Sequence, residues 1–115
     1  MSAQEHDGLL ASTSHLPHMV AALVVRAVAS EPNVIDFCGT GFQDTTRVAS
    51  GSSEVWADIM ESNREMLRAR LIRFQDELSG LLTLLDSGSH TEMEAWLREA
   101  ASQRNEMVEN SRFID

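Results

Sequence analysis

The stretch that decides the fold is residues 5–25, EHDGLLASTSHLPHMVAALVV, which combines a helical pattern with an internal proline. Its apolar residues recur at helical spacing and close into the run Met19–Val25, so we expect one helix over residues 3–29. Pro17 has no backbone N–H, and its ring crowds the preceding turn. The helix should therefore be kinked at Pro17 and should end at the turn residues 31–33.

Polar side chains surround this proline. On an ideal helix His15 and His18 lie about 60° apart, and Ser14 falls one turn before His18. A helix opened at Pro17 would present this face to a ligand, although the imidazoles could equally satisfy backbone groups that the proline frees. No metal site is predicted, because no carboxylate lies one turn from His18 and the chain has no cysteine pair.

The remainder of the chain also has helical patterns. We expect a loop over 30–43, a short helix over 44–49, one helix or a helix pair over 53–86, and a helix over 91–109. The third of these segments carries an apolar stripe formed by Trp56, Met60, Leu67, Leu71, Phe74, Leu78, Leu81 and Leu85. Its width indicates a helical dimer interface.

Capping signals refine these boundaries. Asn63 and Arg64 interrupt the apolar stripe, so the 53–86 segment is either one rod or two helices that meet at a bend. Thr91 and Glu94 have the spacing of a capping box for the last helix, and the tail from Val108 should fray. The predicted fold is a single all-α domain over residues 1–115 with about four or five helices.

A second candidate site lies in the sequence GFQDTTR, residues 41–47. Arg47 could hold a substrate carboxylate, or it could form a surface ion pair with Asp44. Asp44 could also be the N-cap that fixes the arginine on a short helix. The overlapping CGTGFQD is a weak match to a dinucleotide fingerprint, because Asp44 replaces the third glycine and no second strand follows.

Composition excludes several classes of partner. With 18 acidic and 9 basic residues the net charge is −9, which disfavours nucleic acid and anionic membrane surfaces as partners. The run Met19–Val25 is shorter than a bilayer span, so no membrane segment is expected. The one cysteine, Cys38, should be a small buried residue. Without a signal-peptide pattern, the expected location is the cytoplasm.

Three segments together, EHDGLLASTSHLPHMVAALV, GFQDTTRVAS and EVWADIMESNREML, resemble the C-terminal helical domain of the prephenate and arogenate dehydrogenases. The resemblance extends to about Leu85. It implies an intertwined helical homodimer within an NAD-dependent or NADP-dependent enzyme of tyrosine biosynthesis. That enzyme oxidatively decarboxylates prephenate, or arogenate, and prephenate yields 4-hydroxyphenylpyruvate. The cofactor would be bound mainly by an N-terminal nucleotide-binding domain absent from this sequence, so this chain alone is expected to be inactive.

The resemblance also implies roles for individual residues. Arg47 would grip a substrate carboxylate, and Trp56 would reach the site from the partner subunit. The remaining substrate-binding residues would be Ser14, His15 and His18, with His6, Asp7 and Asp44 in support. Tyrosine as a feedback ligand stays open.

Two alternatives stay open: a non-catalytic dimerisation or ligand-sensing module, and a plain helical interaction protein. The chain could be a truncation or a natural stand-alone domain. Thr40 departs from the family pattern, where a glycine is usual, as does the missing Asp-Pro before Trp56.

Overall fold

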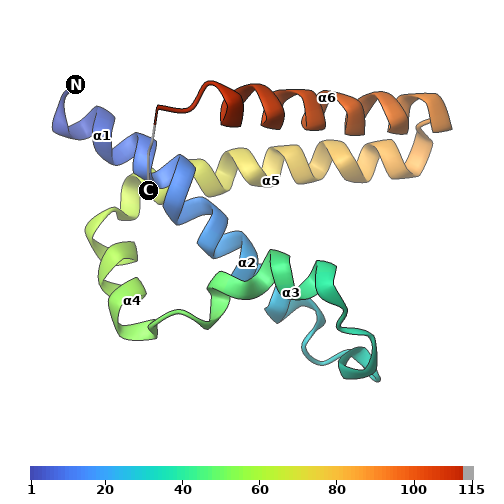
Figure 1. Cartoon of the computed structure of the whole chain (residues 1–115), viewed down its shortest axis with the longest axis horizontal. Helices are drawn as coiled ribbons and strands as arrows, with labels where there is room; N and C mark the ends of the chain where they lie inside the picture. Colours follow the sequence, from blue (N-terminus) through green and yellow to red (C-terminus); the bar gives the residue numbers. More distant parts are fainter. Residues whose placement is uncertain (113–115) are drawn as a thin grey trace. The chain divides into compact units, whose positions relative to one another are not determined.

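The computed structural model describes residues 1–112, and every regular element in that range is helical (Figure 1). In chain order the elements are α1 (Ala3–Leu10), a π-helical turn (Ala11–His15), α2 (Leu16–Val28), a 3₁₀ turn (Val34–Phe37), α3 (Thr40–Thr46), a second 3₁₀ turn (Arg47–Ser50), α4 (Ser53–Ser62), α5 (Arg64–Ser87) and α6 (His90–Glu109). The predicted all-α class is confirmed. Two compact units divide the chain, Met1–Phe74 and the part from Gln75 onward.

The first helix is widened just before its proline. α1, the π-helical turn and α2 follow one another without a break, and the Leu16 N–H donates to the carbonyl of Ala11, five residues earlier. Pro17 stands in the first turn of α2. Because its ring excludes the ordinary carbonyl position of Thr13, the helix takes the wider π turn there. The predicted disturbance therefore occupies the turn before Pro17.

This continuous segment, Ala3–Val28, contains an 18-residue window with a mean hydropathy of 1.4, so by length and composition alone it could cross a membrane. The sequence prediction counted only the run Met19–Val25 and expected no such segment. Core helices meet the same criterion, and this one carries the mostly buried imidazoles of His15 and His18. Polar side chains of that kind are costly against lipid.

The region after α2 differs from the prediction of a loop over 30–43 and a helix over 44–49. Gly39 is the N-cap of α3, and the Gln43 N–H donates to its carbonyl at 3.0 Å. Asp44 therefore lies inside α3 and is not its N-cap. The two glycines at 39 and 41 give a weak local helix signal, which is why the sequence prediction began the helix too late.

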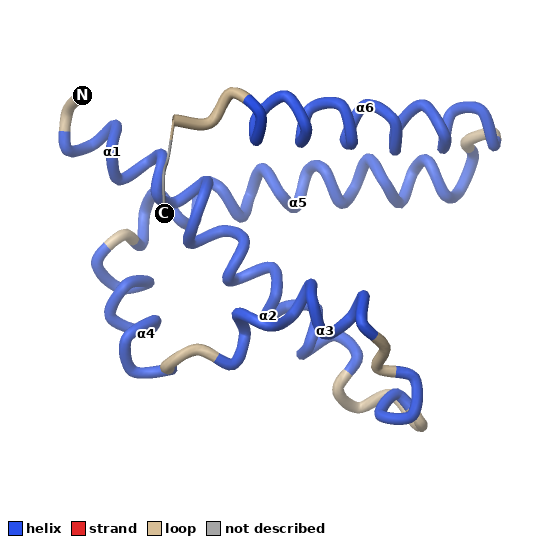
Figure 2. The backbone as a smooth tube through the Cα atoms, viewed as in Figure 1, coloured by secondary structure: helices blue, strands red, loops and turns tan. Residues whose placement is uncertain are grey.

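Of the two alternatives for residues 53–86, the structure has the helix pair, with the break at Asn63. α4 begins after Ser52, whose hydroxyl accepts the Val55 N–H at 3.3 Å, and it ends at Ser62. Asn63 leaves the helical conformation with φ −124° and ψ 35°, and its own carbonyl accepts the Leu67 N–H of α5 at 3.0 Å. The segment 53–86 is thus two helices (Figure 2).

Arg70 on α5 fastens this helix to the first one. Its Nε donates to the Ser12 hydroxyl at 2.6 Å, and its Nη2 donates to the carbonyl of Gly8 at 3.3 Å. A Cβ at Gly8 would lie only 2.9 Å from Nη2. Glycine at this position therefore lets the guanidinium reach the backbone of α1.

In the second unit, the end of α5 turns back into α6 at Gly88 and Ser89 (Figure 1). The capping box is made by Ser89 and Glu92, so the predicted pair of Thr91 and Glu94 was wrong by two positions. Ser89 takes the cap because its extended backbone aims the hydroxyl at the Glu92 N–H. α6 continues through Val108 to Glu109, and the predicted fraying of the last three residues lies outside the described range.

The described residues contain very little buried apolar surface. Ala11, Ala21 and Leu67 are the buried apolar residues there, and all three belong to the first unit. In the second unit Leu81 of the predicted stripe is half-buried, as is the neighbouring Leu84. Leu78 and Leu85 of that stripe are 46% and 62% exposed, and the neighbouring Leu82 is 53% exposed. A chain of this length normally buries a larger core.

Two glycines of the second unit give opposite expectations for substitution by alanine. A Cβ at Gly88 would lie 2.5 Å from the carbonyl oxygen of Leu84, whereas a Cβ at Gly80 would meet nothing within 4 Å. Gly88→Ala should lower the free energy of unfolding by about 1–3 kcal/mol. Gly80→Ala, inside α5, should raise it by about 0.5–1 kcal/mol. Urea unfolding at one fixed protein concentration measures both, and equal effects of the two substitutions would contradict this geometry.

Candidate functional site

Two histidines and a tryptophan gather in the first unit. The imidazole of His18 stacks on the indole of Trp56, with ring centroids 3.6 Å apart and planes inclined by 15°. His15 meets the same indole edge-on, at 6.1 Å and 86°. Only 9% of His15 and 8% of His18 is exposed. The π turn and α2 supply the histidines, α4 supplies the tryptophan, and the result is a compact aromatic cluster.

Gly51 makes the stack possible. A Cβ there would lie 3.3 Å from His18 Cε1 and 3.3 Å from Trp56 Nε1, closer than ordinary van der Waals contact. The absence of a side chain lets the connection between the second 3₁₀ turn and α4 approach α2. The indole of Trp56 packs on His18 of its own chain, and the expectation that Trp56 reaches the site from a partner subunit stays a prediction.

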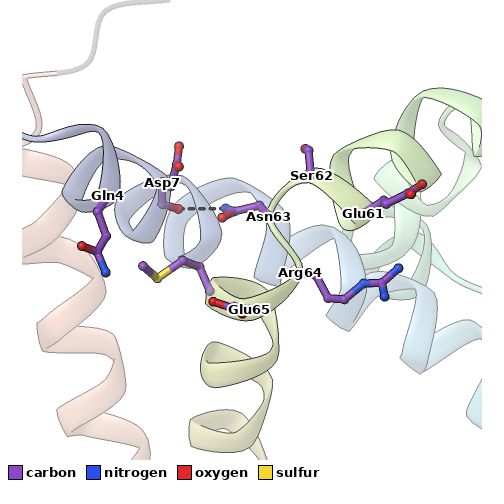
Figure 3. Close-up of a pocket in the computed structure, with 8 residues that line it drawn as sticks. Gln4, Asp7, Glu61, Ser62, Asn63, Arg64 and Glu65 are labelled. Carbon is purple, nitrogen blue, oxygen red and sulfur yellow. Dashed lines mark hydrogen bonds between the residues drawn. The ribbon is translucent and has the colours of Figure 1, made fainter.

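Asn63 links the cluster to α1. Its Nδ2 donates to the Asp7 carbonyl at 2.9 Å (Figure 3). The same nitrogen lies 3.2 Å from Nδ1 of His15. The sequence analysis treated Asn63 only as a helix interruption. Asn63 lies in EVWADIMESNREML, one of the segments that carry the family resemblance, and this position was the sequence signal that could have indicated a role at the site.

The other predicted site residues are exposed. Ser14 lies on the π turn with no hydrogen-bond partner for its hydroxyl among residues 1–112. His6 and Asp7 form a loose surface contact at 3.9 Å. Asp44 and Arg47 are exposed, and no ion pair joins them in the described part of the chain, so the alternative of a surface ion pair is not found. The structure brings His15, His18 and Trp56 together and leaves Ser14 and Arg47 at the surface.

Arg47 nevertheless belongs to a segment that packs on the histidine helix. It begins the 3₁₀ turn Arg47–Ser50, which contacts α2 and leads directly to Gly51. Its guanidinium has no hydrogen bond or ion pair within residues 1–112. An exposed guanidinium without a carboxylate partner is available to an anionic ligand.

Two hollows adjoin these residues. One, of about 650 Å³, opens beside Asn63 and is lined by Gln4, Asp7, Glu61, Ser62, Asn63, Arg64, Glu65 and Met66 (Figure 3). The other, of about 440 Å³, is mainly apolar and includes His18, Trp56, Met60 and Leu71. Carboxylates in the first make it unfavourable for an anion, whereas the second places an aromatic pair beside apolar walls.

The environment of His18 affects its charge. Burial lowers the pKa of the His18 imidazole below its usual value, because the protonated ring would lose its hydration. Neither ring nitrogen has a partner among the described residues, yet no buried polar side-chain atom there is left unpaired. Both nitrogens therefore remain within reach of solvent or a ligand, and the ring is neutral at physiological pH.

Neither the cysteine nor a metal cluster adds to this site. Cys38 is half-buried, and its thiol donates to the Val34 carbonyl at 3.2 Å. Across residues 1–112, no three His, Cys, Asp or Glu side chains are grouped so as to hold a metal ion.

Residues 2–99 match the family described as "Prephenate dehydrogenase, dimerization domain". This chain belongs to that family. It is 30% identical over 109 residues to a prephenate dehydrogenase of Bacillus subtilis, covering 91% of this chain and 29% of that relative. It is 37% identical over 92 residues to a cyclohexadienyl dehydrogenase of Zymomonas mobilis, covering 76% of this chain and 31% of that relative. This dimerization-domain chain therefore spans about 30% of the length of these curated relatives.

Two solved structures share its fold. The arogenate dehydrogenase of Synechocystis superposes with a TM-score of 0.85 at 28% identity, covering 92% of this chain and 40% of that one. The prephenate dehydrogenase of A. aeolicus, solved with hydroxyphenyl propionate and NAD⁺, gives a TM-score of 0.84 at 32% identity, covering 93% and 39%. The expected helical domain of this family is confirmed.

The lowered pKa of His18 predicts a pH dependence of stability. The unfolded chain takes up a proton on this ring near the ordinary pKa of about 6.5, whereas the folded chain does so only at lower pH. The His18 contribution is thus complete above about 6.5 and is lost as pH falls through that value towards the folded pKa. In His18→Asn, the free energy of unfolding measured with urea should depend less on pH between about pH 7.5 and about pH 5. Ser14→Ala should preserve it, and an equal slope in His18→Asn would refute the assignment.

Proposed function

We propose that this chain is the C-terminal domain of an NAD-dependent prephenate dehydrogenase of tyrosine biosynthesis, acting in the cytoplasm. It would supply dimerisation and half of the substrate site for oxidative decarboxylation of prephenate to 4-hydroxyphenylpyruvate. The observation that carries the proposal is the family match over residues 2–99, together with the clustering of His15, His18 and Trp56 that this fold produces. The same contacts are compatible with arogenate as substrate.

The chemistry available to this half-site is binding and orientation. Prephenate carries two carboxylates, and the unpaired guanidinium of Arg47 can hold one of them through two parallel hydrogen bonds. The neutral ring of His18 can exchange a hydrogen bond with a ligand without adding a second fixed charge. Because formation of an aromatic ring drives the loss of carbon dioxide, the main task of the protein is to hold the substrate against the hydride acceptor.

This chain's residues do not fit the nicotinamide cofactor. The CGTGFQD segment, the one weak match to a dinucleotide fingerprint, forms the N-cap and the short helix α3, with no preceding strand among the described residues. NAD or NADP would therefore be held mainly by a separate N-terminal nucleotide-binding domain. The role of the present residues is confined to substrate and assembly.

Homodimer formation is the second part of the proposal. Leu78, Leu82 and Leu85 lie three and four residues apart on α5 and are largely exposed. No residue between 75 and 112 is fully buried, so this helical hairpin has no core of its own. Covering such a stripe with the same stripe of a second copy would remove it from water, in the manner of a coiled-coil seam.

Arg47 is the residue whose removal tests the substrate assignment. In a chimera where this chain replaces the matching region of the A. aeolicus enzyme, Arg47→Ala should raise KM for prephenate by on the order of tenfold to a hundredfold. Arg47→Lys keeps the positive charge but lacks the two-pronged guanidinium, so its KM for prephenate should lie between those of the wild-type chimera and Arg47→Ala. Arg104→Ala, on the exposed face of α6, is the matched control. Unchanged kinetics in Arg47→Ala would reject this role.

The chain alone offers a direct binding assay. In a proton–nitrogen NMR titration, 4-hydroxyphenylpyruvate should shift the signals of His15, His18 and Arg47, and Arg47→Ala should suppress those shifts. Absence of any shift at millimolar ligand would count against a preformed half-site in this chain.

The dimer can be tested with one leucine. Leu82→Glu places a charge in the centre of the exposed stripe and should shift sedimentation from dimer to monomer at micromolar concentration. Ser79→Glu is the control: it adds the same charge at another exposed position of α5 and should leave the dimer intact. A monomeric wild-type chain, or a dimer unaffected by Leu82→Glu, would contradict the proposed interface.

A further inference from the structure

We propose that Asn63 is a positioning residue that fixes His15 as the neutral tautomer with its proton on Nε2. The inference deepens the proposed function and rests on it for the use of that proton. Its basis is the pair of contacts made by one amide nitrogen: Asn63 Nδ2 donates to the Asp7 carbonyl at 2.9 Å and lies 3.2 Å from His15 Nδ1.

The orientation of the amide follows from the backbone. A carbonyl oxygen can only accept, so the Asn63 atom facing the Asp7 carbonyl must be the nitrogen and not the oxygen. That nitrogen carries two hydrogens and accepts none. The ring atom that it meets, Nδ1 of His15, must therefore be the acceptor. Since a neutral imidazole has one N–H, the proton is on Nε2.

The remaining ring nitrogen is open to a ligand. Nε2 of His15 has no hydrogen-bond partner within residues 1–112, yet no buried polar side-chain atom in that range is unpaired. Nε2 must then lie in the small exposed part of this ring, which is 9% exposed overall. His15 thus presents the Nε2–H as a donor, which suits an oxygen of an anionic substrate. Its other nitrogen, Nδ1, accepts from Asn63.

Helix ending does not require this side chain. The backbone N–H of Asn63 bonds to Ile59 and its carbonyl accepts from Leu67, so the main chain alone closes α4 and opens α5. The amide instead reaches residues 48 and 56 positions earlier in the sequence. A role confined to helix capping would leave the choice of an amide at this position unexplained.

The test is nitrogen NMR of the histidine rings in the full 115-residue chain. Long-range proton–nitrogen correlation distinguishes a protonated from an unprotonated ring nitrogen. Wild-type His15 should show a bare Nδ1 and a protonated Nε2. Asn63→Asp replaces the donor with an acceptor and should move the proton to Nδ1, and Asn63→Ala should give a mixture of tautomers. Asn105→Ala, an exposed asparagine of α6, should change nothing.

The wild-type spectrum is decisive even where a variant folds poorly, because a proton on His15 Nδ1 would overturn the inference outright. An Nε2 tautomer that persists unchanged in folded Asn63→Asp and Asn63→Ala would overturn it as well. A purely structural asparagine would alter stability but would leave the tautomer untouched.

Ligand binding separates this inference from the proposed function. If the tautomer responds to Asn63 while 4-hydroxyphenylpyruvate causes no shifts, the positioning stands and the substrate assignment fails. If the ligand binds and Asn63→Ala leaves both tautomer and affinity unchanged, the positioning fails and the substrate assignment stands. With both correct, Asn63→Ala should weaken ligand binding about fivefold.

Discussion

The missing N–H of Pro17 is the constraint on which the rest of the site depends. An uninterrupted α-helix cannot place a proline ring against the carbonyl of Thr13, so the chain widens into the π turn Ala11–His15 before α2 begins. That turn adds a residue to the helical repeat and rotates everything after it. His15 and His18, on either side of the proline, consequently meet a single indole, one at its edge and one on its face.

Three contacts then hold other segments against this turn. Gly51 admits the connection to α4 so that Trp56 can stack, Asn63 reaches both His15 and α1, and Arg70 of α5 binds Ser12 and the Gly8 carbonyl. Gly51 makes its contact possible because it has no side chain, and Asn63 and Arg70 each donate hydrogen bonds to two partners. The histidines are therefore oriented by residues from other segments, as preorganised sites require.

The chain as a whole buries little apolar surface, in contrast to the closely packed histidines. Among the described residues the buried apolar side chains are two alanines and one leucine, while three leucines of α5 face solvent along one stripe. This distribution is the reason for proposing that a second copy of the chain covers the exposed leucines. In the proposed dimer one helix, α5, would carry both Arg70, which binds Ser12 of the π turn, and the exposed leucines.

The sequence alone determined the features that depend on near neighbours. Helical periodicity fixed the all-α class, Pro17 located the disturbed turn to within one turn, and Asn63 marked the break between α4 and α5. The sequence prediction was wrong at the start of α3, where glycines weaken the helix signal. It was also wrong at the capping box of α6, where both Ser89 with Glu92 and Thr91 with Glu94 have the required spacing. Only the tertiary structure decided that Trp56 stacks on its own chain's His18 and that Asn63 holds His15. Those contacts join residues separated by 38 to 56 positions in the numbering, and they depend on the angles at which helices pack, which local spacing does not encode.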